Sequence, residues 1–157
     1  MNETNTAEKA REIYEALCSA IDRHGWSYTR DEDQLLVHFG VQGEDIPMSF
    51  VLAVDADRQI VRLISLMPFR MKEDRRVDGA IITCAATRQL VNGSFDYDFA
   101  NGSISFRMTA SYRESAIGEG LFLYMIDSAC ESVDRFNDKF AAVNSGMLSV
   151  EDFLQSL

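Results

Sequence analysis

The strongest local constraint in the chain is a run of alternating apolar and polar side chains on both sides of the pair Asn101-Gly102. The apolar members are Phe95, Tyr97, Phe99, Ile104, Phe106 and Met108. Alternation places such a set on one face of a strand, and an Asn-Gly pair is typical of a two-residue type I′ turn. We therefore predict a β-hairpin with one buried face and one solvated face. Its expected cross-strand pairs are Phe99 with Ile104, Tyr97 with Phe106, Phe95 with Met108 and, on the solvated face, Asp96 with Arg107.

Two further hairpins are predicted nearer the start of the chain. Residues 26–30 and 35–39 carry alternating apolar side chains on either side of an acidic turn at residues 31–33. Residues 48–55 and 60–67 are rich in Ile, Val, Leu and Phe and are separated by Ala56-Asp57-Arg58. Runs of this length and composition, bounded by turn residues, are typical of strands. The charged stretch at residues 68–76 is expected to be a loop.

Helices are predicted where apolar residues recur every three or four positions, which places them on one face. Residues 5–24 form the first, with Asn5 and Glu8 as a capping pair and Gly25 at its end. The second covers residues 77–91 and stops before Asn92. A long helix is expected at residues 118–144, ended by Gly146, and a short helix is capped by Ser149. The buried stripe expected on the long helix is Phe122, Ile126, Ala129, Val133, Phe136 and Phe140.

The predicted order is one helix, four strands, one helix, two strands and one long helix. Hairpins that alternate with helices favour the α+β class, here an antiparallel sheet of three hairpins with helices packed on one face. A chain of 157 residues buries roughly 70% of its unfolded surface, so its core needs neither a disulfide nor a metal. No repeat or linker divides it, and residues 1–157 are expected to form a single domain.

The second predicted helix is apolar around nearly its whole circumference, so it needs a cover on two sides. If the sheet covers Ala80, Cys84 and Val91, then another element must cover Ile81, Ile82 and Ala85. The candidates are the first helix, the long helix or a second copy of the chain related by a twofold axis. For a homodimer of this kind, Ile82→Asp is expected to give a monomer that still folds.

A basic patch with Arg70, Lys72, Arg75 and Arg76 interrupts an otherwise acidic chain. Such a run is typical of a solvated loop, and its alternative role is to dock an acidic segment of a partner or of a second copy. Together with Ile81, Ile82 and Ala85, the residues Arg75 and Arg76 are therefore the candidate partner or dimer interface.

The balance of charge narrows the classes of partner. The chain has 15 Lys and Arg against 25 Asp and Glu, a net charge of −10. That sign argues against nucleic acid and against an anionic membrane surface, because both require a positive protein face. The first eight residues lack the basic and apolar regions of a secretory signal, so a cytoplasmic location is expected. Cys18, Cys84 and Cys130 are expected to be buried free thiols.

The motifs of catalysis and of metal or cofactor binding are not found in the sequence. The chain has two histidines, His24 and His38, at no spacing typical of metal ligands. Gly118-Glu119-Gly120 places a carboxylate where a phosphate would bind. Asp55-Ala56-Asp57 has Ile60 where a calcium loop needs glycine. No catalytic, cofactor-binding or metal-ligating residue is assigned.

The chain resembles the YbjN family of bacterial proteins. The resemblance rests on residues 92–98, on residues 101–107 followed by the long acidic helix and, in the front half, on Gly25, Trp26, Tyr28, Asp31 and residues 60–67. Family members are labelled sensory transduction regulators and have a fold similar to type III secretion chaperones. The resemblance implies a bacterial cytoplasmic protein that acts by binding another protein, with no catalytic residues to transfer. The apolar second helix and the short helix at residues 149–157 depart from the family pattern.

Two functional hypotheses follow. The first is a non-enzymatic protein-interaction module, chaperone-like or regulatory, which binds a partner by apolar anchors or by strand addition. The alternative is a small-ligand-binding or enzymatic domain with a pocket between the sheet and the last helix, lined by polar groups such as His38, Tyr97 and Arg107.

Overall fold

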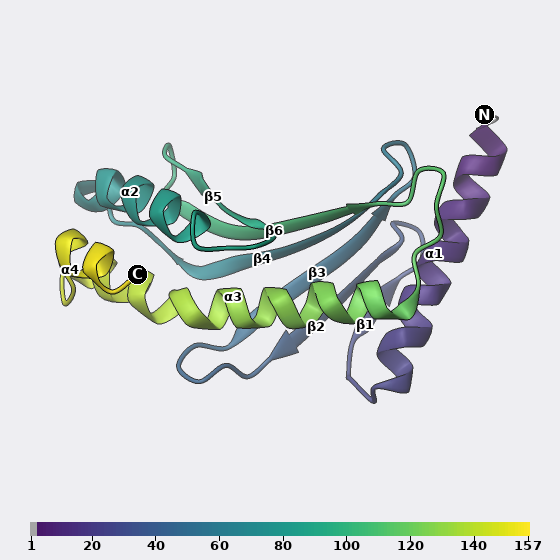
Figure 1. Cartoon of the computed structure of the whole chain (residues 1–157), viewed down its shortest axis with the longest axis horizontal. Coiled ribbons are helices and arrows are strands. Elements are labelled where there is room, and N and C mark those ends of the chain that lie inside the picture. The colour runs from purple at the N-terminus through teal and green to yellow at the C-terminus, as the bar shows by residue number, and fades with distance from the viewer. Residues whose placement is uncertain (1–2) are drawn as a thin grey trace.

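A computed structural model describes residues 3–157 (Figure 1). The described elements, in chain order, are α1 (Glu3–Arg23), β1 (Thr29–Asp31), β2 (Leu36–Val41), β3 (Met48–Asp55), β4 (Ile60–Arg70), a 3-10 turn η1 (Glu73–Arg75), α2 (Arg76–Thr87), β5 (Ser94–Asp98), β6 (Ser103–Ser111), α3 (Glu119–Ser145) and α4 (Val150–Gln155). The order of helices and strands agrees with the predicted one. The predicted domain also includes residues 1–2, which lie outside the described residues.

The six strands form one antiparallel sheet in the order β1-β2-β3-β4-β6-β5. Alternate residues of β2, β3, β4 and β6 are buried on one face, where α1 and α3 contact the sheet. In Figure 1, α3 runs along the sheet from α1 at one end to α2 and α4 at the other. The α+β class and the covering of one face by helices are therefore confirmed.

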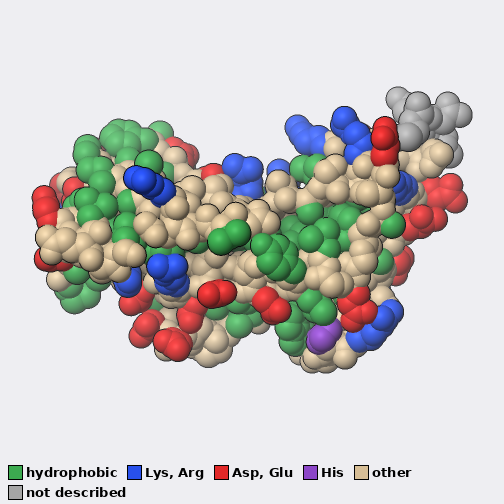
Figure 2. Space-filling model, in the orientation of Figure 1, with side chains coloured by type: hydrophobic (Ala, Val, Ile, Leu, Met, Phe, Trp, Pro, Cys, Tyr) green, Lys and Arg blue, Asp and Glu red, His purple; other side chains and the backbone are tan. Residues whose placement is uncertain are grey.

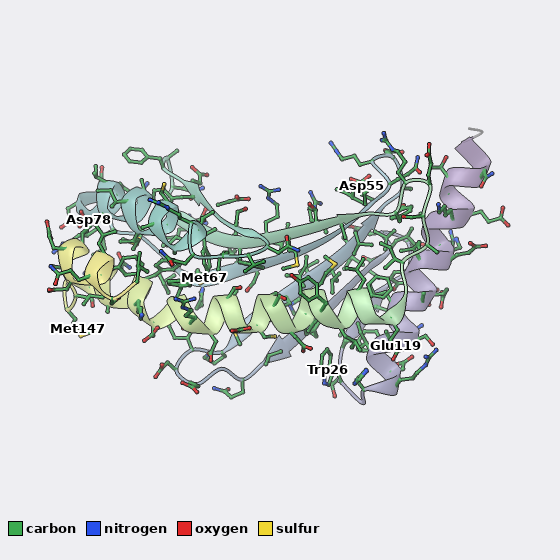
Figure 3. All side chains as sticks on the ribbon, viewed as in Figure 1. Trp26, Asp55, Met67, Asp78, Glu119 and Met147 are labelled. Atoms are coloured by element: carbon green, nitrogen blue, oxygen red, sulfur yellow. The ribbon has the colours of Figure 1, made fainter. Side chains whose placement is uncertain are left out.

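The core forms because the predicted stripes meet across this interface. All six stripe residues of α3 are buried: Phe122, Ile126, Ala129, Val133, Phe136 and Phe140. The sheet contributes buried side chains such as Phe50, Leu63 and Phe106. Figure 3 shows the core side chains between α3 and the sheet, with Asp78 and Met147 at one end of the molecule and Trp26 and Glu119 at the other.

The hairpin around Asn101 has a different register from the predicted one. Asp98 pairs with Ser103, so the loop has four residues, 99–102, rather than two. Phe95 consequently faces Phe106, and Tyr97 faces Ile104. The cause lies in Asp98, whose carboxylate accepts from the amide of Ala100 (2.9 Å) and whose carbonyl accepts from the amide of Gly102 (2.7 Å). The prediction of a type I′ turn at Asn101-Gly102 was wrong because Asp98 forms an Asx turn, which starts the loop earlier.

The ends of several other elements also differ from the expected ones. Strand β1 covers Thr29–Asp31 rather than residues 26–30. Helix α1 already includes Asn5, so the predicted Asn5–Glu8 cap is wrong. Strand β4 continues to Arg70 through an irregularity after Leu66, in a stretch expected to be a loop. Helix α2 ends at Thr87 rather than at residue 91. The predicted ends at Gly25 and Gly146 are confirmed, both with positive φ.

Candidate protein-docking groove

An apolar groove lies between α2 and α4 at one end of the molecule. It has a volume of about 750 Å³ and is closed on one side by the loop between β5 and β6. The residues that line it are Val77, Ala80, Ile81, Cys84, Ala85, Arg88, Gln89, Phe99, Leu154 and Leu157. Figure 2 shows hydrophobic side chains gathered over α2 at this end. We call this surface the α2–α4 groove.

The outer face of α2 supplies the floor of the groove. The side chains of Val77 and Ile81 are 62% and 41% exposed, whereas Ile82 is fully buried. The buried face, which packs between β5 and α3, consists of Gly79, Ile82, Thr83 and Ala86. Since the helix turns 100° per residue, Ile81 and Ile82 point in different directions. Several large apolar side chains that are exposed together are typical of an interaction site.

The two faces of α2 differ from those considered from its sequence. The sheet was considered as the cover of Ala80, Cys84 and Val91, but Ala80 and Cys84 line the groove and Val91 lies beyond the helix, fully exposed. Ile82 was expected to be covered by the first helix, the long helix or a second copy of the chain, and it is fully buried within the chain, where α2 contacts both β5 and α3. The helix is nearly uniformly apolar, so its periodicity did not distinguish the two faces. Of the three residues, Ile81 and Ala85 reach the groove, and Ile82 does not.

Close contact with β5 determines which face of α2 turns inward. A side chain added at Gly79 would lie 2.7 Å from the ring of Tyr97 and from Met71, so only glycine allows this approach. About two turns later, the Thr87 hydroxyl donates to the carbonyl of Phe95 (3.3 Å) and accepts from its amide (2.9 Å). These contacts hold α2 beside the edge strand with Val77 and Ile81 turned outward.

Helix α4 forms the opposite wall of the groove. The Ser149 side chain accepts from the amide of Asp152, which confirms the predicted cap. Phe153 is fully buried and stacks on Phe140, with ring centroids 6.0 Å apart. This anchor turns the next residue, Leu154, toward the groove, where it is 43% exposed.

The two arginines of the predicted interface have structural partners. Arg76 donates to the carbonyls of Phe99 (2.9 Å), Ala100 (2.6 Å) and Met71 (3.1 Å), and it therefore holds the β5–β6 loop against the start of α2. Arg75 forms an ion pair with Asp78 (3.1 Å). These contacts position the groove, and neither arginine lines it.

Arg88 is the cation that lines the groove. It lies at the C-terminal end of α2 and is exposed. Its side chain has no hydrogen bond or ion pair to another side chain in the described part of the chain. The sequence pattern did not assign Arg88 to any site.

Other groove residues were missed because they come from separate segments. Phe99 is 56% exposed, since the four-residue loop removes it from the strand face where it was expected. Leu154 lies on the predicted short helix, but the sequence did not indicate which surface its side chain would reach. On α2, Val77, Ile81 and Cys84 follow one another at helical spacing, a signal that could have been found by testing both orientations of the helix.

The residues proposed for the alternative pocket do not meet. His38 and Arg107 lie on the open face of the sheet, where His38 contacts Ser49 (2.7 Å) and Arg107 binds Asp96 (2.6 Å). Tyr97 lies on the other face, under α2. A hollow of about 580 Å³ beside β2 and α3 is lined by other residues, including Trp26 and Asp127. These three side chains therefore do not line a common pocket.

The Asp96–Arg107 pair was predicted as a cross-strand contact on the solvated face. Their side chains do form an ion pair, but the shifted register makes it diagonal: Asp96 pairs in the ladder with Ser105, and Arg107 with Ser94. Hydrogen bonds from Arg107 hold the pKa of Asp96 below its usual range, and a hydrogen bond from Ser94 makes a smaller contribution in the same direction. An exposed pair of this kind is typical of a stabilising surface contact.

The three cysteines have different environments. Cys18 is buried as predicted, Cys130 is half-buried and Cys84 is exposed in the groove, so the prediction for Cys84 was wrong. Burial raises the pKa of the Cys130 thiol to about 11, with Asp127 and Asp134 adding to the effect. Among the described residues, no group of three or more His, Cys, Asp or Glu is arranged to hold a metal ion. None of the described helices combines the length and apolar composition needed to cross a membrane.

Comparisons with known proteins agree on the fold. A chain of the crystal structure of YbjN from E. coli matches with a TM-score of 0.60 at 10% identity, covering 86% of this chain and 93% of that chain. Chains of the ExsC-ExsE complex and of the HopA1-SchA chaperone-effector complex match with TM-scores of 0.54 and 0.51. Both share 12% identity and cover 80% of this chain and 92% of their own. The fold is therefore the type III secretion chaperone-like fold.

No curated protein matches the chain. The family model described as "Putative bacterial sensory transduction regulator" matches residues 14–142, which include everything from the middle of α1 to near the end of α3. Helix α4 lies outside the match, although it forms one wall of the groove. Since the match covers most of the chain, this protein belongs to the YbjN family.

Proposed function

We propose that this chain is a non-enzymatic protein-interaction module of the bacterial cytoplasm, chaperone-like or regulatory, that holds a segment of a partner protein in the α2–α4 groove. The observation that carries the proposal is the convergence of exposed apolar side chains from three separate segments on one hollow. These side chains are Val77, Ile81, Phe99 and Leu154. Exposing them together costs solubility, and burying them on binding would contribute free energy.

The related structures support a protein as the ligand. Two of them are complexes between proteins, one described as a chaperone with its effector. The family description, a regulator of sensory transduction, names no chemical reaction. These likenesses favour a binding role over a catalytic one.

The size of the groove favours a partner segment over a second copy of the chain. Ten residues line the groove. A stable interface between two folded proteins takes roughly 20–30 residues from each side. A homodimer through α2 would therefore need much additional contact, whereas a single short segment can fill the groove.

The test is to recover the tagged protein from its own host in three forms: wild type, Ile81→Asp and Leu66→Asp. Leu66 is the matched control, because it is 60% exposed but lies on β4, outside the groove. The main protein recovered with wild type is then produced separately and titrated against the three forms by calorimetry. We expect one-to-one binding to wild type and Leu66→Asp, and at least a tenfold loss for Ile81→Asp.

Three outcomes contradict the proposal. One is recovery of the wild-type chain alone as a monomer. Another is a partner that binds Ile81→Asp as tightly as wild type, which would place the interface elsewhere. The third is a dimer in light scattering that Ile81→Asp converts to a monomer, since a second copy would then occupy the groove.

A further inference from the structure

We infer that the segment held by the α2–α4 groove is an amphipathic α-helix of about three turns with an acidic residue positioned to bind Arg88. This inference rests on the proposed function and specifies its partner. Three observations carry it: the state of the backbone groups around the groove, the spacing of its apolar side chains and the one uncommitted charge on its wall.

The backbone around the groove is already hydrogen-bonded. The floor is the helix α2, whose interior peptide groups are paired within the helix, and one wall is the short helix α4. The carbonyls of Phe99 and Ala100 accept from Arg76. At the edge strand β5, Thr87 binds both backbone groups of Phe95. A segment that enters an apolar groove must therefore pair its own backbone groups, and an α-helix does so internally.

The apolar side chains have the spacing of a helix-packing seam. On α2, Val77, Ile81 and Cys84 are separated by four and three residues, and Arg88 follows four residues later. This is the spacing that places residues on one stripe facing a second helix. The small residues Ala80 and Ala85 beside the stripe allow a helix axis to approach to about 8–10 Å.

The length of α2 sets the length of the guest. Its 12 residues extend about 18 Å at 1.5 Å per residue. A helix of about 11–12 residues, or three turns, would match this length. With apolar residues at positions i, i+3 or i+4, and i+7, it would cover Val77, Ile81 and Leu154.

Charge determines the remaining specificity. Arg75 is paired with Asp78, and Arg76 is occupied by carbonyls, whereas Arg88 has no side-chain partner in the described part of the chain. Binding of the guest would shield Arg88 from water, so an unpaired arginine would be unfavourable there. An Asp or Glu at the matching end of the guest helix supplies the partner.

The experiment uses a random library of 16-residue peptides displayed on phage, selected on the wild-type chain and depleted on Ile81→Asp. Enriched sequences are synthesised, and their affinities are measured by fluorescence anisotropy. We expect apolar residues at helical spacing, at least one Asp or Glu, and helical circular dichroism of the bound peptide. Basic, proline-rich or strictly alternating sequences, or no enrichment over Ile81→Asp, overturn the inference.

A charge exchange tests the role of Arg88. We expect Arg88→Glu to weaken an enriched acidic peptide by about threefold to fivefold. Replacing the peptide's acidic residue by Lys should then restore binding to Arg88→Glu. Arg113→Glu changes the net charge equally on an exposed loop outside the groove and should have little effect. Equal losses for both variants, or no restoration, overturn the assignment of Arg88.

The two proposals fail in distinguishable ways. If the host partner depends on Ile81 but its bound segment is extended or basic, the helix inference fails and the interaction module remains. If no partner depends on Ile81 and no peptide is selected, both fail.

Discussion

Ile81 and Ile82 are adjacent in the sequence but lie on different sides of α2, one 41% exposed in the groove and the other fully buried. Ile82 contributes to the core beneath the helix, whereas Ile81 lines the groove and is partly exposed. The same substitution at the two positions therefore separates stability from binding.

Ile82→Asp is expected to reduce the free energy of unfolding by about 3–5 kcal/mol, because it removes apolar packing and leaves a buried carboxylate without a partner. Ile81→Asp should change it by less than about 1 kcal/mol, as is usual for an exposed position. Urea denaturation followed by circular dichroism measures both. Equal losses would show that the two sides of α2 are not as different as described.

Phe153 fixes α4, and with it one wall of the groove, to the aromatic cluster of α3. We expect Phe153→Ala to cost about 3–5 kcal/mol or to detach α4 locally, which would increase proteolysis near Met147. Leu154→Ala, at the adjacent exposed position, is the control and should cost less than about 1 kcal/mol. Unchanged stability and proteolysis in Phe153→Ala would contradict the anchoring role.

Glycine-to-alanine substitutions should have opposite effects in two helices. At Gly79 a Cβ would lie 2.7 Å from Tyr97, so Gly79→Ala should push α2 from β5 and cost about 1–3 kcal/mol. At Gly120 in α3 nothing lies within 4 Å of the added atom. Gly120→Ala should therefore stabilise the protein by about 0.4–1 kcal/mol. Thermal unfolding of both variants is the measurement, and the same sign at both sites would refute the close contact at Gly79.

Asp55 should contribute a pH-dependent stability. The backbone amide of Arg58 donates to its carboxylate (2.9 Å), and with the Arg58 guanidinium it holds the pKa of Asp55 below its usual value. The unfolded chain lacks these bonds, so the ionised carboxylate stabilises the fold above about pH 4. This contribution is lost as the pH falls through the lowered pKa of the folded state.

Asp55→Asn is accordingly expected to destabilise the protein at pH 7 by less than about 1 kcal/mol, and the difference from wild type should shrink toward pH 2. The free energy of unfolding at several pH values checks this. Asp57→Asn, at an exposed position of the same turn, serves as control. A difference between wild type and Asp55→Asn that grows as the pH falls would contradict the argument.

The sequence itself determined the order of the helices and strands, the antiparallel sheet and the buried stripe of α3. These features depend on local periodicity and on turn residues, as at Gly146, where φ is positive and glycine ends the helix. The resemblance to the YbjN family, which the family model confirms, came from the same local features. Local patterns are readable because each one depends on neighbours within a few residues.

The α2–α4 groove was decided by the tertiary structure. The periodicity of the nearly uniformly apolar α2 could not show that Gly79 and Tyr97 turn Ile82 inward and Ile81 outward. The Asx turn at Asp98 and the clamp from Arg76 carry Phe99 to this surface, and burial of Phe153 brings α4 beside it. Local periodicity specifies which side chains share a face of one element. Which face meets solvent depends on the packing of segments distant in sequence, and that packing is determined only when the whole core assembles.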